Sequence, residues 1–598
     1  MGLLQDVRMT ARTVIGLRRT LKWVDDIDPE SENLVPDDIE ATVDRHGANV
    51  VFRFEGQLIT YDEFEARANT IAHWALSQGL KPGDCVALFM ENRPDYVAVW
   101  FGLSKVGIVT ALINAHLSDN ALAHCVNIAD AKAVILGAEQ HEQLQSARPF
   151  LTGSPDVWTL GGPVADGVQD LEKTLATLPS TRPDRSHRAG IKASALCLYV
   201  YTSGTTGLPK AARLPHARTQ GMMRSFVAAC KATSRDRIYV TLPLYHGTGG
   251  LCGVGMALSV GASIILRRRF SASAFWDEAA KEGATLFAYI GELCRYLLNQ
   301  PPHPMERAHR IRSGFGNGLR PEIWSAFHER FAIPYLAEFY GSTEGNVSFM
   351  NLDGKVGAVG RIPKLLRKRF DNVKIVKFDV ETESPLRGPD GFCMLAEPNE
   401  AGEMIGRISS EVRERFEGYN DPGATRKKIL RDVFETGDMW YRTGDLMKMD
   451  EGGWIYFVDR TGDTFRWKGE NVATNEVGEV LSGYPGIEHA NVYGVQVPGM
   501  DGRAGMAAIT ASETCDLAGL HAWMRERLPD YAVPVFLRLQ REAETTGTFK
   551  YRKVDLVKDG FDPGEVNEPL YFAHPERGEY VPLTQDEYET ILAGGYRL

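Results

Sequence analysis

The segment Tyr201-Thr-Ser-Gly-Thr-Thr-Gly-Leu-Pro-Lys210 carries the strongest signal in the sequence. It follows an apolar run, residues 195–201, with the length and composition of a buried strand. Backbone N–H groups freed by glycine, together with Ser and Thr hydroxyls, form a concave donor surface suited to phosphate oxygens. A Walker A loop is excluded, because Pro209 and Ala211 flank the lysine where that loop needs GK[ST] opening a helix. The density of donors after a strand favours a phosphate-binding loop over an ordinary surface turn.

Short apolar runs alternate with helical segments on both sides of this loop, from about residue 50 to residue 460. Residues 86–90, 108–112 and 133–136 predict strands, and residues 96–105 predict a helix. Strands that alternate with helices predict parallel sheets covered by helices, an α/β fold.

A polar, glycine-containing stretch, residues 460–469, precedes a final block with strands of its own at 490–495 and 506–509 and a helix at 517–528. We therefore predict an α/β protein with an α+β C-terminal domain: a large domain of sheets layered with helices, and a small mobile domain after a hinge. The predicted boundaries are 1–45 for an N-terminal helix and acidic linker, 46–461 for the large domain and 462–598 for the small one.

Composition excludes several classes of protein. The chain has 598 residues, 43% of them hydrophobic, which excludes a disordered or collagen-like protein. Its 67 Lys and Arg residues against 78 Asp and Glu give a formal net charge of −11, which argues against a nucleic-acid binder. The eight cysteines form no CxxC motif and have mostly apolar neighbours, as expected of reduced thiols in a cytoplasmic protein.

One stretch, residues 238–266, lacks Asp, Glu, Lys and Arg and must be considered as a membrane span. Pro243, His246 and six glycines interrupt it and would weaken a continuous lipid-facing helix. We interpret it as a buried helix followed by a buried strand at 262–266.

The N-terminus has the clearest charge asymmetry. Residues 1–24 combine five basic residues with Asp6 alone, and their apolar residues recur at helical spacing. Residues 25–40 hold eight acidic and no basic residues, and we expect Pro29 and Pro36 to break any helix there. The basic helix either lies on an anionic membrane, at the inner face of the plasma membrane, or docks on the protein's own acidic domain. The five basic residues are Arg8, Arg12, Arg18, Arg19 and Lys22.

Four further motifs follow the phosphate loop in order: Tyr340-Gly-Ser-Thr-Glu-Gly345, Tyr441-Arg-Thr-Gly-Asp445, Asp459-Arg460 and Thr546-Gly-Thr-Phe-Lys550. The ordered set resembles the adenylate-forming superfamily, which includes acyl-CoA synthetases, peptide-synthetase adenylation domains and luciferases. The resemblance covers roughly residues 50–560.

Within this superfamily, residues 459–472 (DRTGDTFRWKGENV) resemble the signature of the fatty-acid transport proteins, also called very-long-chain acyl-CoA synthetases. Residues 289–297 and 316–320 are similar to that group as well. Animal members usually begin with a membrane span, and none is visible here, so the chain resembles the mycobacterial type of long-chain fatty-acid–CoA ligase.

The resemblance implies a reaction in two steps. A fatty-acid carboxylate attacks the α-phosphate of ATP and releases pyrophosphate, and the thiolate of coenzyme A (CoA) then displaces AMP from the acyl-adenylate. ATP, Mg²⁺ and CoA as cosubstrate are therefore expected. The alternatives are a fatty acyl-AMP ligase that passes the adenylate to a carrier protein, and a fatty-acid uptake or binding component at the membrane.

The resemblance also implies roles for the residues that match its motifs. The pyrophosphate end of ATP would be held by Thr202, Ser203, Gly204, Thr205, Thr206, Gly207 and Lys210. Adenine would contact Gly316, Asn317, Gly318 and Tyr340, and the nucleotide site would continue through Gly341, Ser342 and Thr343. Mg²⁺ would be bound by Glu344 and Thr202.

The ribose hydroxyls would bind Asp445, assisted by Arg460, and Arg466 is assigned to the same nucleotide site. The acyl carboxylate would lie beside His246, and Lys550 would reach the α-phosphate.

Two positions depart from the family pattern. Gly462 stands at the hinge, where Asp or Lys is common, so a hinge salt bridge is not expected although rotation is compatible with glycine. Phe549 precedes the lysine where glycine is usual, and Lys553 is a second candidate for the catalytic lysine.

Overall fold

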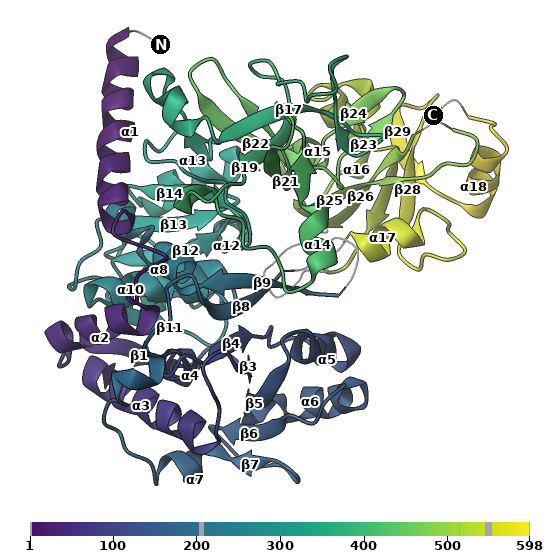
Figure 1. Cartoon of the computed structure of the whole chain (residues 1–598). Helices are drawn as coiled ribbons and strands as arrows, with labels where there is room; N and C mark the ends of the chain where they lie inside the picture. The colour runs from purple at the N-terminus through teal and green to yellow at the C-terminus, as the bar shows by residue number, and fades with distance from the viewer. Residues whose placement is uncertain (1–2, 203–207, 501, 513–514, 544–552, 597) are drawn as a thin grey trace. The chain divides into compact units, whose positions relative to one another are not determined.

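The computed structural model describes residues 3–202, 208–500, 502–512, 515–543, 553–596 and 598, with backbone alone for residues 3–12, 365 and 554. The chain forms two compact units (Figure 1). Unit 1 comprises Met1–Leu319, Ile323–Val356 and Ile408–Ile429, and unit 2 comprises Arg320–Glu322, Gly357–Arg407 and Leu430–Leu598.

The first sheet of unit 1 has seven strands in the order β7-β6-β5-β3-β4-β8-β9. They are β3 (Cys85–Phe89), β4 (Val109–Leu112), β5 (Ala131–Gly137), β6 (Asp156–Leu160), β7 (Gln169–Asp170), β8 (Leu196–Thr202) and β9 (Lys210–Pro215). All neighbours are parallel except the β8–β9 hairpin at one edge. The strands predicted at 86–90, 108–112, 133–136 and 195–201 are confirmed.

The second sheet of unit 1 has eight strands in the order β15-β14-β13-β12-β10-β11-β1-β2. They are β1 (Val50–Phe54), β2 (Gln57–Thr60), β10 (Arg237–Val240), β11 (Ser263–Leu266), β12 (Leu286–Ile290), β13 (Ser313–Asn317), β14 (Leu336–Gly341) and β15 (Ser348–Met350). The six central strands, β14, β13, β12, β10, β11 and β1, are parallel to one another. The edge strands β2 and β15 pair antiparallel with β1 and β14.

Helices pack around these two sheets (Figure 1). They are α1 (Leu3–Val24), α2 (Val35–His46), α3 (Tyr61–Ser77), α4 (Pro94–Ser104), α5 (Asp119–Ile128), α6 (His141–Ala147), α7 (Leu171–Leu175), α8 (His216–Arg224), α9 (Val227–Cys230), α10 (Val254–Val260), α11 (Phe275–Glu282), α12 (Gly291–Leu298), α13 (Pro321–Phe331) and α14 (Pro422–Lys427). Residues 238–266 form β10, a short helical turn (η4, Gly247–Gly253), α10 and β11 inside the core, as predicted. Over the described residues, no helix combines the length and apolar composition that a membrane span requires.

Residues 35–45 are not part of the linker that the sequence predicts, because they belong to α2, whereas residues 25–34 form no helix or strand. Pro36 lies in the first turn of α2, where its missing N–H costs nothing and its fixed φ suits the helix, so it begins this helix rather than breaking one. The side chain of Asp37 caps the same helix by accepting the backbone N–H of Leu34 (2.9 Å).

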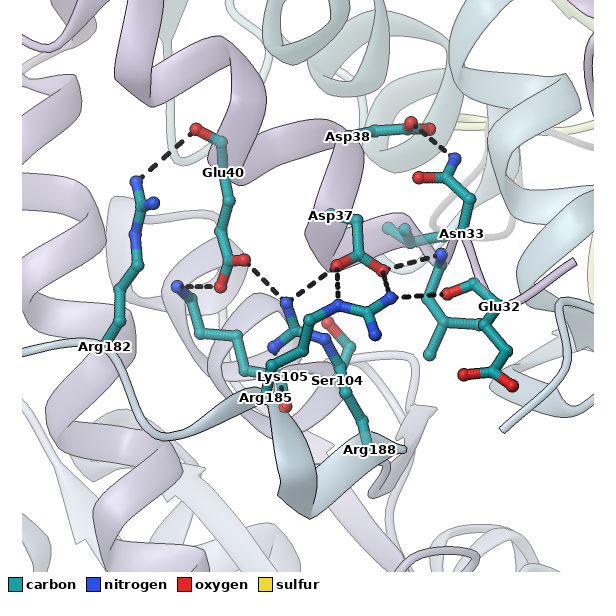
Figure 2. A network of polar contacts seen from close by, with 12 residues as sticks. Glu32, Asn33, Asp37, Asp38, Glu40, Ser104, Lys105, Arg182, Arg185 and Arg188 are labelled. Atoms are coloured by element: carbon teal, nitrogen blue, oxygen red, sulfur yellow. Dashed lines mark hydrogen bonds and ion pairs between the residues drawn. The ribbon is translucent and has the colours of Figure 1, made fainter. Parts of the chain in front are cut away.

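The acidic residues of α2 belong to a buried ion-pair network (Figure 2). Glu40 binds Lys105 (2.7 Å), which is fully buried, and Arg188 (2.6 Å). Asp37 accepts from Arg188 (2.9 Å) and from the more exposed Arg185 (3.0 Å). The network therefore fastens α2 to α4 and to the segment before β8.

Unit 2 is largely antiparallel, which corrects the expectation that strands and helices alternate in parallel order up to residue 460. Its largest sheet contains β16 (Gly360–Arg361), β17 (Val373–Asp379), β18 (Ser384–Pro385), β19 (Gly402–Arg407), β20 (Ile429–Arg431), β21 (Met439–Met449) and β22 (Trp454–Arg460). The described pairs are antiparallel, and they bury a small core around Val376, Ile405 and Trp440.

The C-terminal block has a hydrophobic core of its own, drawn from residues between Phe465 and Ile591. Its five-stranded sheet contains β25 (Ile487–Val495), β26 (Ala504–Ala511), β27 (Phe536–Leu539), β28 (Leu570–His574) and β29 (Glu579–Pro582), and β23 (Phe465–Trp467) pairs with β24 (Glu470–Val472). The helices are α15 (Thr474–Ser482), α16 (Leu517–Arg525), α17 (Val554–Asp559) and α18 (Gln585–Leu592). The strands predicted at 490–495 and 506–509 are confirmed, and the domain boundary at 461/462 stays a prediction.

Candidate functional site

The phosphate-loop motif occupies the β8–β9 hairpin at the edge of the first sheet. Thr202 ends β8, Lys210 begins β9, and the two are direct cross-strand partners. The hairpin therefore holds the Thr202 hydroxyl and the Lys210 ammonium group at the two ends of the loop. The residues between them that were assigned to phosphate lie outside the described residues: Ser203, Gly204, Thr205, Thr206 and Gly207.

Tyr419 links this hairpin to Glu344. Its hydroxyl donates to Glu344 Oε1 (2.7 Å) and hydrogen-bonds the Thr202 side chain, and Lys210 Nζ lies 5.7 Å from its ring centroid. Burial and the Glu344 carboxylate raise the pKa of this phenol far above its usual value, so it stays a donor. Three residues assigned to ATP and Mg²⁺ thus meet at one side chain.

The backbone around Tyr419 is fixed by β9. Tyr419 pairs with Ala212, Asn420 N–H donates to the Ala211 carbonyl (2.9 Å), and Arg213 N–H donates to the Gly418 carbonyl (3.1 Å). Residues 418–420 therefore extend the sheet beyond its edge strand, which carries Tyr419 to the base of the loop.

Glu344 lies in the turn between β14 and β15, and only 7% of it is exposed. Arg218 of α8 clamps this turn, donating to the carbonyl oxygens of Thr343 (2.7 Å), Ser342 (3.0 Å) and Gly345. Three carbonyls bound to one guanidinium hold the turn in a single conformation.

The residues assigned to adenine stand at the carboxyl ends of adjacent parallel strands, where open α/β sheets bind ligands. Gly316 and Asn317 end β13, and Tyr340 and Gly341 end β14. Asn317 Oδ1 is buried and has no hydrogen-bond partner in the described part of the chain, so it is a free acceptor for an amino group.

The loop after β13 is packed tightly from behind. A Cβ on Gly291 would stand 1.7 Å from the Gly318 carbonyl oxygen, and a Cβ on Gly316 would stand 2.1 Å from the Tyr289 carbonyl oxygen. Buried Glu338 accepts the Leu319 N–H (3.0 Å) and the Tyr289 hydroxyl (2.8 Å). Burial raises the pKa of Glu338 to about 8. Tyr289 therefore supports this loop through its hydroxyl and its backbone.

His246 is half-buried and directly precedes η4, with its ring centroid 4.5 Å from that of Tyr245. The Tyr245 hydroxyl is buried, and no described residue hydrogen-bonds it. This position is compatible with contact to a carboxylate, and the assignment of His246 stays a prediction.

In unit 2, Asp445 and Arg460 are cross-strand partners in β21 and β22. Two residues predicted to share the ribose are thus side by side. The adjacent Asp459 is fully buried and accepts N–H groups of Thr474 (2.5 Å) and Asn475 (2.8 Å), so it fixes the start of α15.

The hinge region differs from expectation in one respect. Lys553 Nζ pairs with Asp463 Oδ2 (3.1 Å) and donates to Thr474 Oγ1 (2.8 Å), so a salt bridge does form one residue beyond Gly462. Arg466 lies in β23 and pairs with Glu381 (2.9 Å). Lys550 lies outside the described residues.

The donor set favours a hard cation carried on phosphate. Among the described residues, no group of three or more His, Cys, Asp and Glu side chains could hold a metal by itself. Glu344 with the nearby Thr202 hydroxyl offers one carboxylate and one neutral oxygen. This set fits Mg²⁺, which takes one or two protein oxygens and fills its other positions with phosphate and water.

The sequence did not identify Tyr419, Arg218 or Glu338. Each contacts its partner only after folding, across elements far apart in the chain, and none lies in a local motif that predicts the contact.

A model of the AMP-binding enzyme family matches residues 39–408, and a model of the AMP-binding enzyme C-terminal domain matches residues 476–550. The chain is 42% identical over 550 residues to long-chain fatty acid transport protein 6 of Mus musculus, covering 91% of this chain and 88% of that protein. It is 41% identical over 551 residues to long-chain fatty acid transport protein 1 of Homo sapiens, covering 91% and 84%.

Solved structures share the fold at lower identity. The anthranilate CoA ligase AuaEII in complex with anthranoyl-AMP has a TM-score of 0.75 at 19% identity, covering 89% of this chain and 98% of that one. ATP-bound MatB from Rhodopseudomonas palustris has a TM-score of 0.72 at 22% identity, covering 88% and 98%.

Proposed function

The chain belongs to the AMP-binding enzyme family, and on this premise we propose that it is a ligase that joins long-chain or very-long-chain fatty acids to CoA through an acyl-adenylate. The fatty-acid substrate is suggested by the long-chain fatty acid transport proteins, which are 41–42% identical to this chain. The observation that carries the nucleotide site is the convergence of Thr202, Lys210 and Glu344 on Tyr419.

The proposed reaction needs two anions brought together and the charge on the transferring phosphorus stabilised. Lys210 and the hydroxyls of Thr202, Ser203, Thr205 and Thr206 bind the β- and γ-phosphates. Glu344 and Thr202 hold Mg²⁺, which when bound neutralises part of the phosphate charge. His246 orients the fatty-acid carboxylate toward the α-phosphorus, and no protein nucleophile is required because the substrate supplies its own.

The base and the sugar are held by other residues. Asn317 Oδ1 accepts from the adenine amino group, and Tyr340 packs against the ring. Asp445 accepts hydrogen bonds from the ribose hydroxyls, a role suited to the two oxygens of a carboxylate, and Arg460 and Arg466 assist. Lys550 approaches the α-phosphate during adenylation, and in the second step the CoA thiolate attacks the acyl carbonyl and releases AMP.

The test is an assay of purified protein with oleate, ATP and Mg²⁺, with and without CoA, in which acyl-AMP and acyl-CoA are resolved. We expect CoA-dependent thioester formation with release of AMP and pyrophosphate. Acyl-AMP that accumulates regardless of CoA would assign the protein to the acyl-AMP ligases. Fatty-acid binding without ATP turnover would leave only the uptake component.

A further inference from the structure

Helix α1 has one face packed on unit 1 and one face open (Figure 1). The packed face contacts α8 and α9. Thr13 Oγ1 donates to Asp353 (2.5 Å), and a Cβ on Gly16 would stand 2.9 Å from the Leu352 side chain. The docking predicted as one alternative for this helix therefore occurs, and it uses only one face.

The open face is basic and amphipathic. Ile15 is 51% exposed and Trp23 is 36% exposed. At 100° per residue, the exposed residues fall within one arc of the helix surface. They are Ile15, Arg18, Arg19, Lys22 and Trp23. None of the three cations forms an ion pair with any residue that the structure describes.

Asp25 and Asp26, which follow α1 directly, do not offset this charge, because each is paired with another residue of unit 1. Asp25 binds Arg413 (2.6 Å), and Asp26 binds Arg224 (3.0 Å). The open face therefore remains a local positive patch on a protein whose formal net charge is −11.

We propose that the open face of α1 binds the surface of an anionic lipid bilayer. Basic side chains are attracted to anionic headgroups, Trp prefers the interface, and an exposed Ile adds apolar burial. An acidic protein surface would match the cations but leave Trp23 and Ile15 unexplained, which favours lipid. Arg8 and Arg12 precede Ile15 and Arg19 by seven residues, two helical turns, so the basic register continues toward the N-terminus.

The test is cosedimentation of the full chain with phosphatidylcholine vesicles that contain or lack phosphatidylglycerol. We expect binding only with phosphatidylglycerol, and its loss in high salt. Each basic residue near an anionic surface strengthens binding about fivefold, so a variant with Arg18→Glu, Arg19→Glu and Lys22→Glu should bind at least about 100-fold more weakly. Trp23→Ser should weaken binding without changing its salt dependence.

The matched control carries the same charge change elsewhere on unit 1, at exposed Lys173, Arg235 and Lys281. It should bind like the wild type, apart from the weak effect of net charge. Both triple variants should keep their thermal midpoint and their ligase activity without vesicles, which separates this proposal from the proposed function. Equal binding to both kinds of vesicle, no binding, or equal loss in both triple variants would each overturn it.

Discussion

Tyr419 offers the sharpest test of the site at the scale of one residue, since phenylalanine removes only its hydroxyl. Tyr419→Phe keeps the ring beneath Lys210 but deprives Glu344 Oε1 of a donor. Loss of a hydrogen bond to a charged group costs about 1.5–3 kcal/mol, so kcat/KM for ATP should fall about 10- to 100-fold. The Mg²⁺ concentration needed for half-maximal rate should rise. Pyrophosphate release measured across Mg²⁺ concentrations reports both effects.

Tyr199 supplies a control for this substitution. Its hydroxyl donates to Oδ1 of Asn420 (3.0 Å), the residue after Tyr419, and the Asn420 side chain in turn donates to the Ile128 carbonyl oxygen. Tyr199→Phe should leave the Mg²⁺ requirement unchanged. If the two variants shared one Mg²⁺ dependence, Tyr419 would have no specific role toward Glu344.

The two candidate lysines can be separated by substitution. Lys553 is engaged with Asp463 and Thr474, which favours Lys550 as the group that reaches the α-phosphate. Lys550→Ala should lower the rate of adenylation at least about 100-fold, the usual cost of a lost charge-stabilising group, while ATP still binds. Lys553→Ala should affect adenylation much less. Single-turnover acyl-AMP formation and ATP titration test this, and the reverse order of effects would reassign the role.

Motifs predict the residues that touch substrate better than the residues that hold them. Thr202, Lys210 and Glu344 could be identified because each lies in a short pattern whose chemistry is local. Tyr419 and Arg218 could not, because their importance depends on a sheet edge and a helix position that exist only in the folded chain.

Among the elements, the sequence predicts the parallel strands of unit 1 well, since buried strands are continuous apolar runs between turn signals. The sequence does not distinguish the antiparallel strands of unit 2, between residues 357 and 460, from the parallel strands of unit 1. Some of these unit 2 strands are only partly buried, as in β17 where Val376 alone is fully buried, and their pairing joins distant segments. Helix α2 was missed because Pro36 is a breaker inside a helix but a good first-turn residue.

The junction of α2 and α8 should make unit 1 sensitive to acid. His216 is buried and its Nδ1 accepts the Val35 N–H (3.3 Å), and burial lowers its pKa to about 4. Folding thus favours the neutral ring, so its stabilisation is complete above the ordinary pKa of 6.5 and is lost as the pH falls from 6.5 to 4. The loss is about 1.4 kcal/mol per pH unit and about 3 kcal/mol in total.

Urea unfolding of wild type and His216→Gln between pH 4 and 7 measures the free energy of unfolding across this range. The range spans the pKa of His216 in the folded protein, about 4, and its ordinary value of 6.5. The glutamine variant should be less stable at neutral pH and lose less stability on acidification. His187→Gln, at an exposed position, should follow the wild type. Parallel curves for His216→Gln and wild type would show that His216 does not cause the acid sensitivity.

At the scale of the whole molecule, the distribution of cores indicates where the chain can bend. The core of the C-terminal block is formed by residues between Phe465 and Ile591. The small core of the preceding sheet is formed by residues between Val376 and Trp440. Gly462 falls between these two cores, in a segment whose own side chains contribute to neither. The predicted hinge thus lies between two cores, and rotation about it would have to break the hydrogen bonds from Asp459 to Thr474 and Asn475.

Gly462 is not required by the conformation described. An added Cβ would meet nothing within 4 Å, and its φ is not positive, so the described conformation accommodates other residues here. Gly462→Pro restricts the rotation predicted for this hinge and should retain one half-reaction while slowing the other, and overall turnover, by at least about tenfold. Gly462→Ala, which does not fix φ as proline does, should have a smaller effect. Acyl-AMP formation without CoA and thioester formation from preformed acyl-AMP measure the two half-reactions separately. A blocked rotation between two conformations slows one half-reaction and spares the other. Equal rates in the proline variant and the wild type, or equal loss of both half-reactions, would therefore exclude a hinge at this position.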